Sequence, residues 1–176
     1  EELRLENLIG FSTLVVGIRA FNVHKDLAFK NKILWEYVKQ GGTVIVQYNT
    51  SRGFDGNIAG PYPIEFSRDR VTDENAEVTF LQPKHPLLNT PNKITATDFE
   101  GWVQERGLYF SSSWDAAYQP LLSMQDKGES PKQGSLLVAD YGKGKFILTG
   151  LSFFRELPAG VPGAYRLFIN LISYGQ

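Results

Sequence analysis

The sequence predicts an α/β domain in which a mainly parallel sheet is flanked by helices and ends in an antiparallel hairpin. Two short β-branched runs, residues 13–17 (TLVVG) and 43–47 (TVIVQ), are separated by a helical pattern at 25–40. A strand, a helix and a strand in close succession form a βαβ unit, in which the two strands are parallel. Two later apolar runs, 135–140 and 145–150, are joined by a glycine-rich turn. This second pattern is typical of an antiparallel hairpin.

The predicted helix at 25–40 carries signals at both ends. Its apolar residues recur at helical spacing and indicate one buried face. We expect Asn22 or Asp26 to cap its start, because short polar side chains accept hydrogen bonds from the first backbone N–H groups. Gly41 and Gly42 follow its last turn, where glycine commonly ends a helix.

The rest of the chain is less regular until its last segment. A final helix is predicted at 163–174, with Pro162 in its first turn. The middle predicts a long loop at 48–63, strands at 77–81 and 120–124, and a proline-rich turn at 83–91. No repeat and no domain boundary are visible, so we expect residues 1–176 to form a single domain.

Composition excludes several classes of site. The 176 residues carry a net charge of −1, which argues against a dedicated nucleic-acid-binding protein. The chain has no cysteine and two histidines, so thiol nucleophiles and three-histidine zinc sites are excluded, and we expect no metal and no cofactor. No apolar run approaches the roughly 20 residues of a membrane span. Because the chain lacks an initiator methionine, we expect it to be a piece of a longer protein, and its compartment cannot be read from the residues.

Polar residues follow three of the predicted strands directly. Arg19 and Asn22 follow the first strand, Tyr48 and Asn49 follow the second, and Arg155 and Glu156 follow the last. Ligands in open α/β sheets bind beyond the carboxyl ends of the strands, where such residues gather. A ligand site at this edge and purely structural ion pairs, such as Arg19 with Glu156, are both compatible with the pattern.

Two segments resemble the class I glutamine amidotransferase-like fold, in particular its ThuA-like branch. Residues 41–49 (GGTVIVQYN) fit the segment that carries the nucleophile of that fold, and residues 150–156 (GLSFFRE) fit the segment that supplies its base. The resemblance implies a flavodoxin-like sheet. However, Tyr48 or Asn49 stands at the position of the nucleophilic cysteine and Phe154 at that of the histidine, so the glutaminase reaction is excluded and we expect no catalytic residue.

Four further stretches are similar to the C-terminal region of bacterial LmbE-like (PIG-L family) deacetylases: residues 16–22, 68–74, 99–107 and 153–160. The zinc motif of those enzymes is absent, so the resemblance implies an accessory domain beside a linked deacetylase domain. It is also compatible with a periplasmic location. The chain begins near the second strand of that fold. The first βα unit is therefore expected to be missing, which leaves an open sheet edge and suggests pairing with a second copy.

The resemblance and the strand ends together suggest a carbohydrate ligand, since aromatic faces with charged side chains beside them suit a sugar. The proposed binding residues are Arg19, Asn22, Tyr48, Asn49, Trp102, Glu105, Arg106, Arg155 and Glu156. A wider set adds Arg68, Arg70, Asp73, Glu74 and Glu100, with Trp102 or Tyr109 as the flat face. Two alternatives stay open: a structural or dimerising domain, and a sugar hydrolase or isomerase that uses Glu105 and Glu156 as acid and base.

Overall fold

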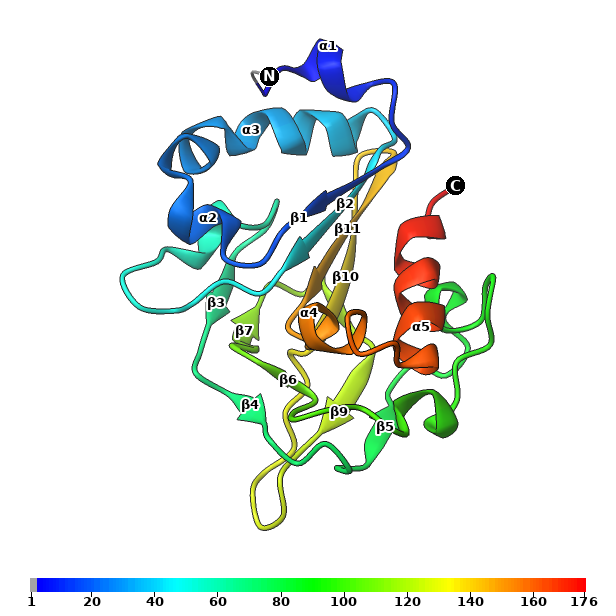
Figure 1. Ribbon diagram of the computed structural model, residues 1–176. Coiled ribbons are helices and arrows are strands. Elements are labelled where there is room, and N and C mark those ends of the chain that lie inside the picture. Colours follow the sequence, from blue (N-terminus) through cyan, green and yellow to red (C-terminus); the bar gives the residue numbers. More distant parts are fainter. Residues whose placement is uncertain (1–2) are drawn as a thin grey trace.

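The computed structural model describes residues 3–176, and within them a five-stranded mixed sheet forms the centre of the molecule (Figure 1). The strand order is β1-β2-β11-β10-β8. The bounds of these strands are β1 Thr13–Val16, β2 Thr43–Gln47, β11 Gly144–Thr149, β10 Leu136–Tyr141 and β8 Gln119–Pro120. The first three strands are parallel, whereas β10 pairs antiparallel with both β11 and β8. The α/β class and the C-terminal hairpin are confirmed.

The βαβ unit forms as the sequence predicts. Helix α3 (Lys25–Lys39) connects β1 to β2, and Thr13 lies opposite Thr43 in the parallel register. Gly41 has φ +119°, and the N–H groups of Gly41 and Gly42 donate to carbonyl groups of the last turn of the helix. Because β11 pairs parallel with the other side of β2, the carboxyl ends of β1, β2 and β11 meet at one edge of the sheet.

The expected cap of α3 is wrong. The residue at the N-cap is His24, and its side chain makes no capping hydrogen bond. Asn22 is unavailable because its side chain bonds both backbone groups of Thr50, and Asp26 already lies inside the helix.

Helices cover both faces of the sheet (Figure 1). Successive strand residues point to opposite faces, so Val44 and Val46 join one apolar cluster and Ile45 joins the other. Helix α3 packs on the first face, and α5 (Pro162–Ser173) packs on the second. Pro162 lies in the first turn of α5, as predicted. No helix within residues 3–176 is both long and apolar enough to cross a membrane.

The middle of the chain forms three two-stranded antiparallel sheets below the carboxyl ends of the central strands (Figure 1). They pair β3 (Ile64–Phe66) with β7 (Ser111–Trp114), β4 (Arg70–Val71) with β6 (Gly107–Leu108), and β5 (Val78–Phe80) with β9 (Leu122–Met124). The short helical segments are α1 Leu5–Leu8, α2 Ala20–Val23, η1 Gly56–Ile58, η2 Pro86–Leu88, η3 Ala96–Phe99 and α4 Phe153–Glu156.

The strand predicted at 120–124 is divided between two sheets. Its first residue, Pro120, ends β8 in the central sheet, and its last three residues form β9. Leu121 joins the two sheets, because its N–H donates to Leu136 and its carbonyl accepts from Leu81. The long loop predicted at 48–63 contains the single turn η1.

Strand β1 lies at the edge of the central sheet, where β2 is its strand neighbour. Four apolar side chains on and beside it are exposed: Ile9, Phe11, Val15 and Ile18. The described residues place no further strand against this edge.

Candidate functional site

Three aromatic rings meet at the carboxyl edge of the central sheet. Tyr48 directly follows β2, Tyr109 follows β6, and Phe154 lies in α4 after β11. The Tyr48 ring stacks on Tyr109 at a centroid distance of 5.7 Å and an interplanar angle of 15°. The centroid of the Phe154 ring lies 5.4 Å from that of the Tyr48 ring. Tyr48 is buried and contacts both of the other rings, whereas Tyr109 and Phe154 stay partly exposed.

A buried carboxylate holds two arginines beside these rings. The Glu105 side chain is 0% exposed, and its two oxygens accept from Arg155 Nε and Arg70 Nη2, each at 2.8 Å. The Arg155 guanidinium also lies 4.8 Å from the Phe154 ring centroid. Because a buried carboxylate needs compensation by opposite charge, Glu105 fixes the positions of both arginines.

A hollow of about 290 Å³ opens next to this cluster and is lined by Arg68, Arg70, Leu108 and Tyr109. The pairing of β4 with β6 brings two of these residues together, since Arg70 lies opposite Leu108 in the register. Tyr109 both stacks on Tyr48 and lines the hollow. The hollow thus combines one aromatic ring with two cationic side chains.

Left-handed backbone conformations gather around the same cluster. Within residues 3–176, three non-glycine residues have positive φ: Arg19 at 56°, Gln104 at 71° and Tyr109 at 52°. The N–H of Arg19 donates to the carbonyl of Tyr48 at 2.8 Å, and Gln104 directly precedes Glu105. Such conformations cost about 1–3 kcal/mol each and concentrate at binding and catalytic sites.

The charges of the cluster act on Tyr48. Burial raises the pKa of the Tyr48 hydroxyl, and the positive charges of Arg19 and Arg155 lower it in part. Arg19 therefore lies close enough to act on the cluster, although its own side chain is exposed. Four of the predicted site residues, namely Arg19, Tyr48, Glu105 and Arg155, are brought together here.

Glu156 is buried behind the cluster. Its Oε2 accepts the N–H of Val103 at 2.9 Å, and its Oε1 has no hydrogen-bond partner among the described residues. Burial raises the pKa of Glu156, against the lowering effect of the Val103 N–H and of the charges on Arg106 and Arg155. Arg19 and Glu156, the structural ion pair considered from the sequence, form no salt bridge.

Asn22 and Asn49 hold the backbone that carries Tyr48. Asn22 bonds the N–H of Thr50 at 2.8 Å and its carbonyl at 3.1 Å. Asn49 is fully buried, accepts the N–H of Phe21 at 3.2 Å and donates to the carbonyl of Gln47. The side-chain amides of both residues are thus committed to backbone groups.

The structure does not bring Trp102 and Arg106 to the hollow. Trp102 is 3% exposed, donates through Nε1 to the carbonyl of Asp98 at 2.9 Å and stacks on Phe99. The Arg106 guanidinium is buried as well, and donates to the carbonyls of Ala76 and Phe99. Both side chains therefore belong to the core, where they bond to backbone carbonyls of the middle of the chain.

Of the wider set of predicted binding residues, some lie at the hollow and others do not. Arg68 and Arg70 line the hollow. Asp73 and Glu74 act electrostatically on the buried Arg106, and Glu100 lines a different hollow beside Arg106.

Sequence reasoning missed Phe154 and Leu108 as members of the site. The position of Phe154 could have indicated its place in the site, since this residue follows the last strand and adjoins Arg155. Leu108 gave none, because its place depends on the pairing of two-residue strands far apart in the sequence. Residues 3–176 contain no group of three or more histidine, aspartate or glutamate side chains arranged to hold a metal ion.

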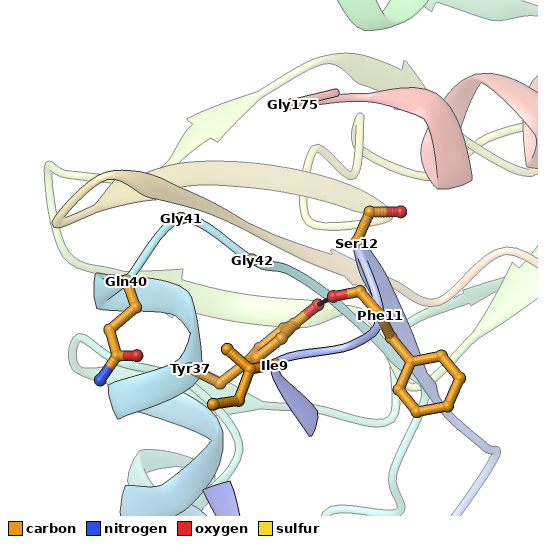
Figure 2. A pocket seen from close by; sticks show the side chains of 8 residues that line it. All are labelled: Ile9, Phe11, Ser12, Tyr37, Gln40, Gly41, Gly42 and Gly175. Atoms are coloured by element: carbon orange, nitrogen blue, oxygen red, sulfur yellow. Dashed lines mark hydrogen bonds between the residues drawn. The ribbon is translucent and has the colours of Figure 1, made fainter. Parts of the chain in front are cut away.

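A second hollow, of about 230 Å³, lies at the opposite end of β2, where the chain enters the strand through Gly41 and Gly42 (Figure 2). Tyr37 forms part of its wall and donates its hydroxyl to the carbonyl of Phe11 at 2.8 Å. The lining contains no charged side chain. Unlike the hollow beside Tyr109, this one therefore offers a ligand no charged group.

The comparisons with known proteins concern the fold. No protein-family profile matches the sequence, and no curated protein matches it. A cytoplasmic protein from Salmonella typhimurium superposes with a TM-score of 0.64 at 13% identity, over 97% of this chain and 74% of its own. A second, from Salmonella typhimurium LT2, gives 0.62 at 12% identity, over 98% and 75%. A cold-adapted β-galactosidase from Rahnella sp. R3 gives 0.50 at 15% identity, over 93% of this chain and 23% of the enzyme. These likenesses establish the fold alone.

Proposed function

We propose that this chain is a non-catalytic domain that binds a carbohydrate at the carboxyl edge of its central sheet. One observation carries the proposal: Tyr109, fixed by its stack on Tyr48, lines a hollow beside Arg68 and Arg70. Sugars present apolar C–H faces that pack on aromatic rings, and a few polar side chains then orient their hydroxyl groups. The left-handed backbone at Tyr109 supports a site that is fixed before the ligand arrives.

The carboxylates of the cluster support binding over catalysis. Acid–base chemistry on a sugar needs two carboxylates that face one pocket. Both oxygens of Glu105 are engaged by arginines, and Glu156 is fully buried with one oxygen on a backbone N–H. Neither residue lines the hollow.

The wider context rests on the resemblance to amidotransferase-like and deacetylase-associated domains. In that resemblance Tyr48 and Phe154 stand where a nucleophile and its base would face each other, and the 5.4 Å contact between their rings supports this assignment. The proposal is then an accessory domain of flavodoxin-like type that positions substrate for a linked deacetylase domain.

A thermal-shift screen with neutral and acidic sugars tests the proposed function. A ligand at 100 times its Kd stabilises the folded state by about 2.7 kcal/mol, so we expect the midpoint to rise by roughly 5 °C for a matching sugar. Tyr109→Ala should weaken binding about tenfold through the lost stacking surface. Tyr109→Phe, which keeps the ring, and Tyr165→Ala, on helix α5, should retain the shift. No rise with any sugar at millimolar concentration would refute the proposal.

A dimerisation domain is the second candidate, and the open edge of β1 favours it. Residues 11–18 (FSTLVVGI) carry no charge, and Phe11 and Val15 are 60% and 44% exposed. Edge strands of single-chain proteins are commonly protected by charges, prolines or bulges. A second copy of this chain could pair along this edge without burying a charged side chain.

A further inference from the structure

We infer that the carbohydrate bound beside Tyr109 is acidic, and that Arg68 receives its carboxylate or phosphate group. This inference rests on the proposed function and names the class of its ligand. It follows from the charges around the hollow and from the hydrogen-bonding capacity of its lining.

The cluster has more cationic than anionic groups. Four guanidinium groups surround it, from Arg19, Arg68, Arg70 and Arg155, and Glu105 is the carboxylate that pairs with two of them. Within residues 3–176 neither Arg68 nor Arg19 forms a salt bridge.

The nearby acids do not offset this excess in the hollow. Asp69 lies between Arg68 and Arg70 in the chain but lines a different hollow, together with Ser111 and Lys132. Glu156 is buried and bonded to a backbone N–H. Arg68 therefore remains as an exposed cation at the wall of the hollow.

The side chains of the lining also offer few hydrogen-bond acceptors. A guanidinium group can only donate, Leu108 contributes an apolar side chain, and the Tyr109 hydroxyl supplies one donor and one acceptor. A neutral sugar needs acceptors as well as donors for its hydroxyl groups. An oxyanion is acceptor-only, and the planar fork of arginine matches a carboxylate or phosphate in bidentate fashion.

The geometry then assigns three tasks to the lining. Glu105 already fixes Arg70, so this arginine can orient ring hydroxyls without further ordering. Tyr109 supplies the stacking face, and Arg68, free of a carboxylate partner in the described chain, takes the oxyanion.

Isothermal titration calorimetry on the whole chain tests this inference, with four probes: glucuronate, glucose 6-phosphate, methyl glucoside and inorganic phosphate. We expect at least one acidic sugar to bind about tenfold more tightly than methyl glucoside. The difference should disappear in Arg68→Gln and shrink at high salt, since exposed charges are screened. Lys143→Gln removes an exposed cation from the hairpin turn at the far end of β11 and should leave the difference intact.

The outcomes separate the inference from the proposed function. Equal affinity for acidic and neutral sugars would overturn the acidic ligand and leave the carbohydrate site standing. A preference for acidic sugars that survives Arg68→Gln would overturn the role of Arg68. Inorganic phosphate binding as tightly as glucose 6-phosphate would overturn the sugar component, and no binding by any sugar would overturn both proposals.

Discussion

Two glutamates near the site are buried, and their carboxylates have different partners. Glu105 forms ion pairs with Arg70 and Arg155, which are both partly exposed. Glu156 has one N–H donor, from Val103, and an oxygen without a partner among the described residues. Because burial disfavours a charged carboxylate, the first glutamate anchors the arginines of the site, whereas the second is a pH-sensitive point in the core.

The fold should lose stability at Glu156 as pH rises. Burial raises the folded pKa of this carboxyl above its ordinary value of 4.5. Its contribution to stability is therefore present below that value and is lost as pH rises through the raised pKa. We expect the free energy of unfolding of the wild type to fall relative to that of Glu156→Gln as the pH rises above 4.5 and through the raised pKa.

Urea unfolding across this pH range measures the difference, with Glu77→Gln as the matched control at an exposed carboxyl. The control should follow the wild type at every pH. A gap between wild type and Glu156→Gln that stays constant with pH would contradict the raised pKa.

Local sequence signals predicted the elements that form the central sheet and failed where pairing is decided by distant partners. The strands at 13–16 and 43–47 are marked by apolar β-branched runs that end at glycine or polar residues. By contrast, residues 120–124 divide between two sheets, because Leu121 bonds to both Leu136 and Leu81. No local pattern in the segment encodes these two partners.

The same limit applies to the site. Arg19, Tyr48 and Arg155 could be chosen because each follows a strand of the parallel group, and parallel strands bring their carboxyl ends together. Trp102 does not offer a flat face to a ligand, since it is buried and its indole N–H donates to the carbonyl of Asp98. Tyr109, the alternative considered with it, lines the hollow.

Strand β1 is the edge through which we expect two copies of the chain to associate. If two copies pair along this edge, a charge in the middle of the strand should oppose pairing by like-charge repulsion and by the cost of desolvation. We expect the wild type to dimerise with rising concentration and Val15→Lys to stay monomeric, as measured by sedimentation velocity. Val23→Lys, which places the same charge at an exposed valine in α2, should dimerise like the wild type. A wild type that stays monomeric at several hundred micromolar would contradict pairing through β1.

At the scale of the whole molecule, the two ends of the central sheet differ in chemistry. The carboxyl end carries the aromatic rings and the arginines around Tyr109, with the small antiparallel sheets packed beside it (Figure 1). The amino end carries the uncharged hollow beside Tyr37 (Figure 2). We propose that the ligand binds at the carboxyl end of the sheet and not at the amino end.

Chemical-shift mapping by two-dimensional NMR, with glucuronate as the probe, tests this claim most directly. The account predicts that the backbone signals of Leu108 and Tyr109 and the side-chain Nε–H signal of Arg68 move on titration, whereas those of Gly41 and Gly42 stay in place. Movement centred on Gly41 and Gly42, with Tyr109 unchanged, would contradict it.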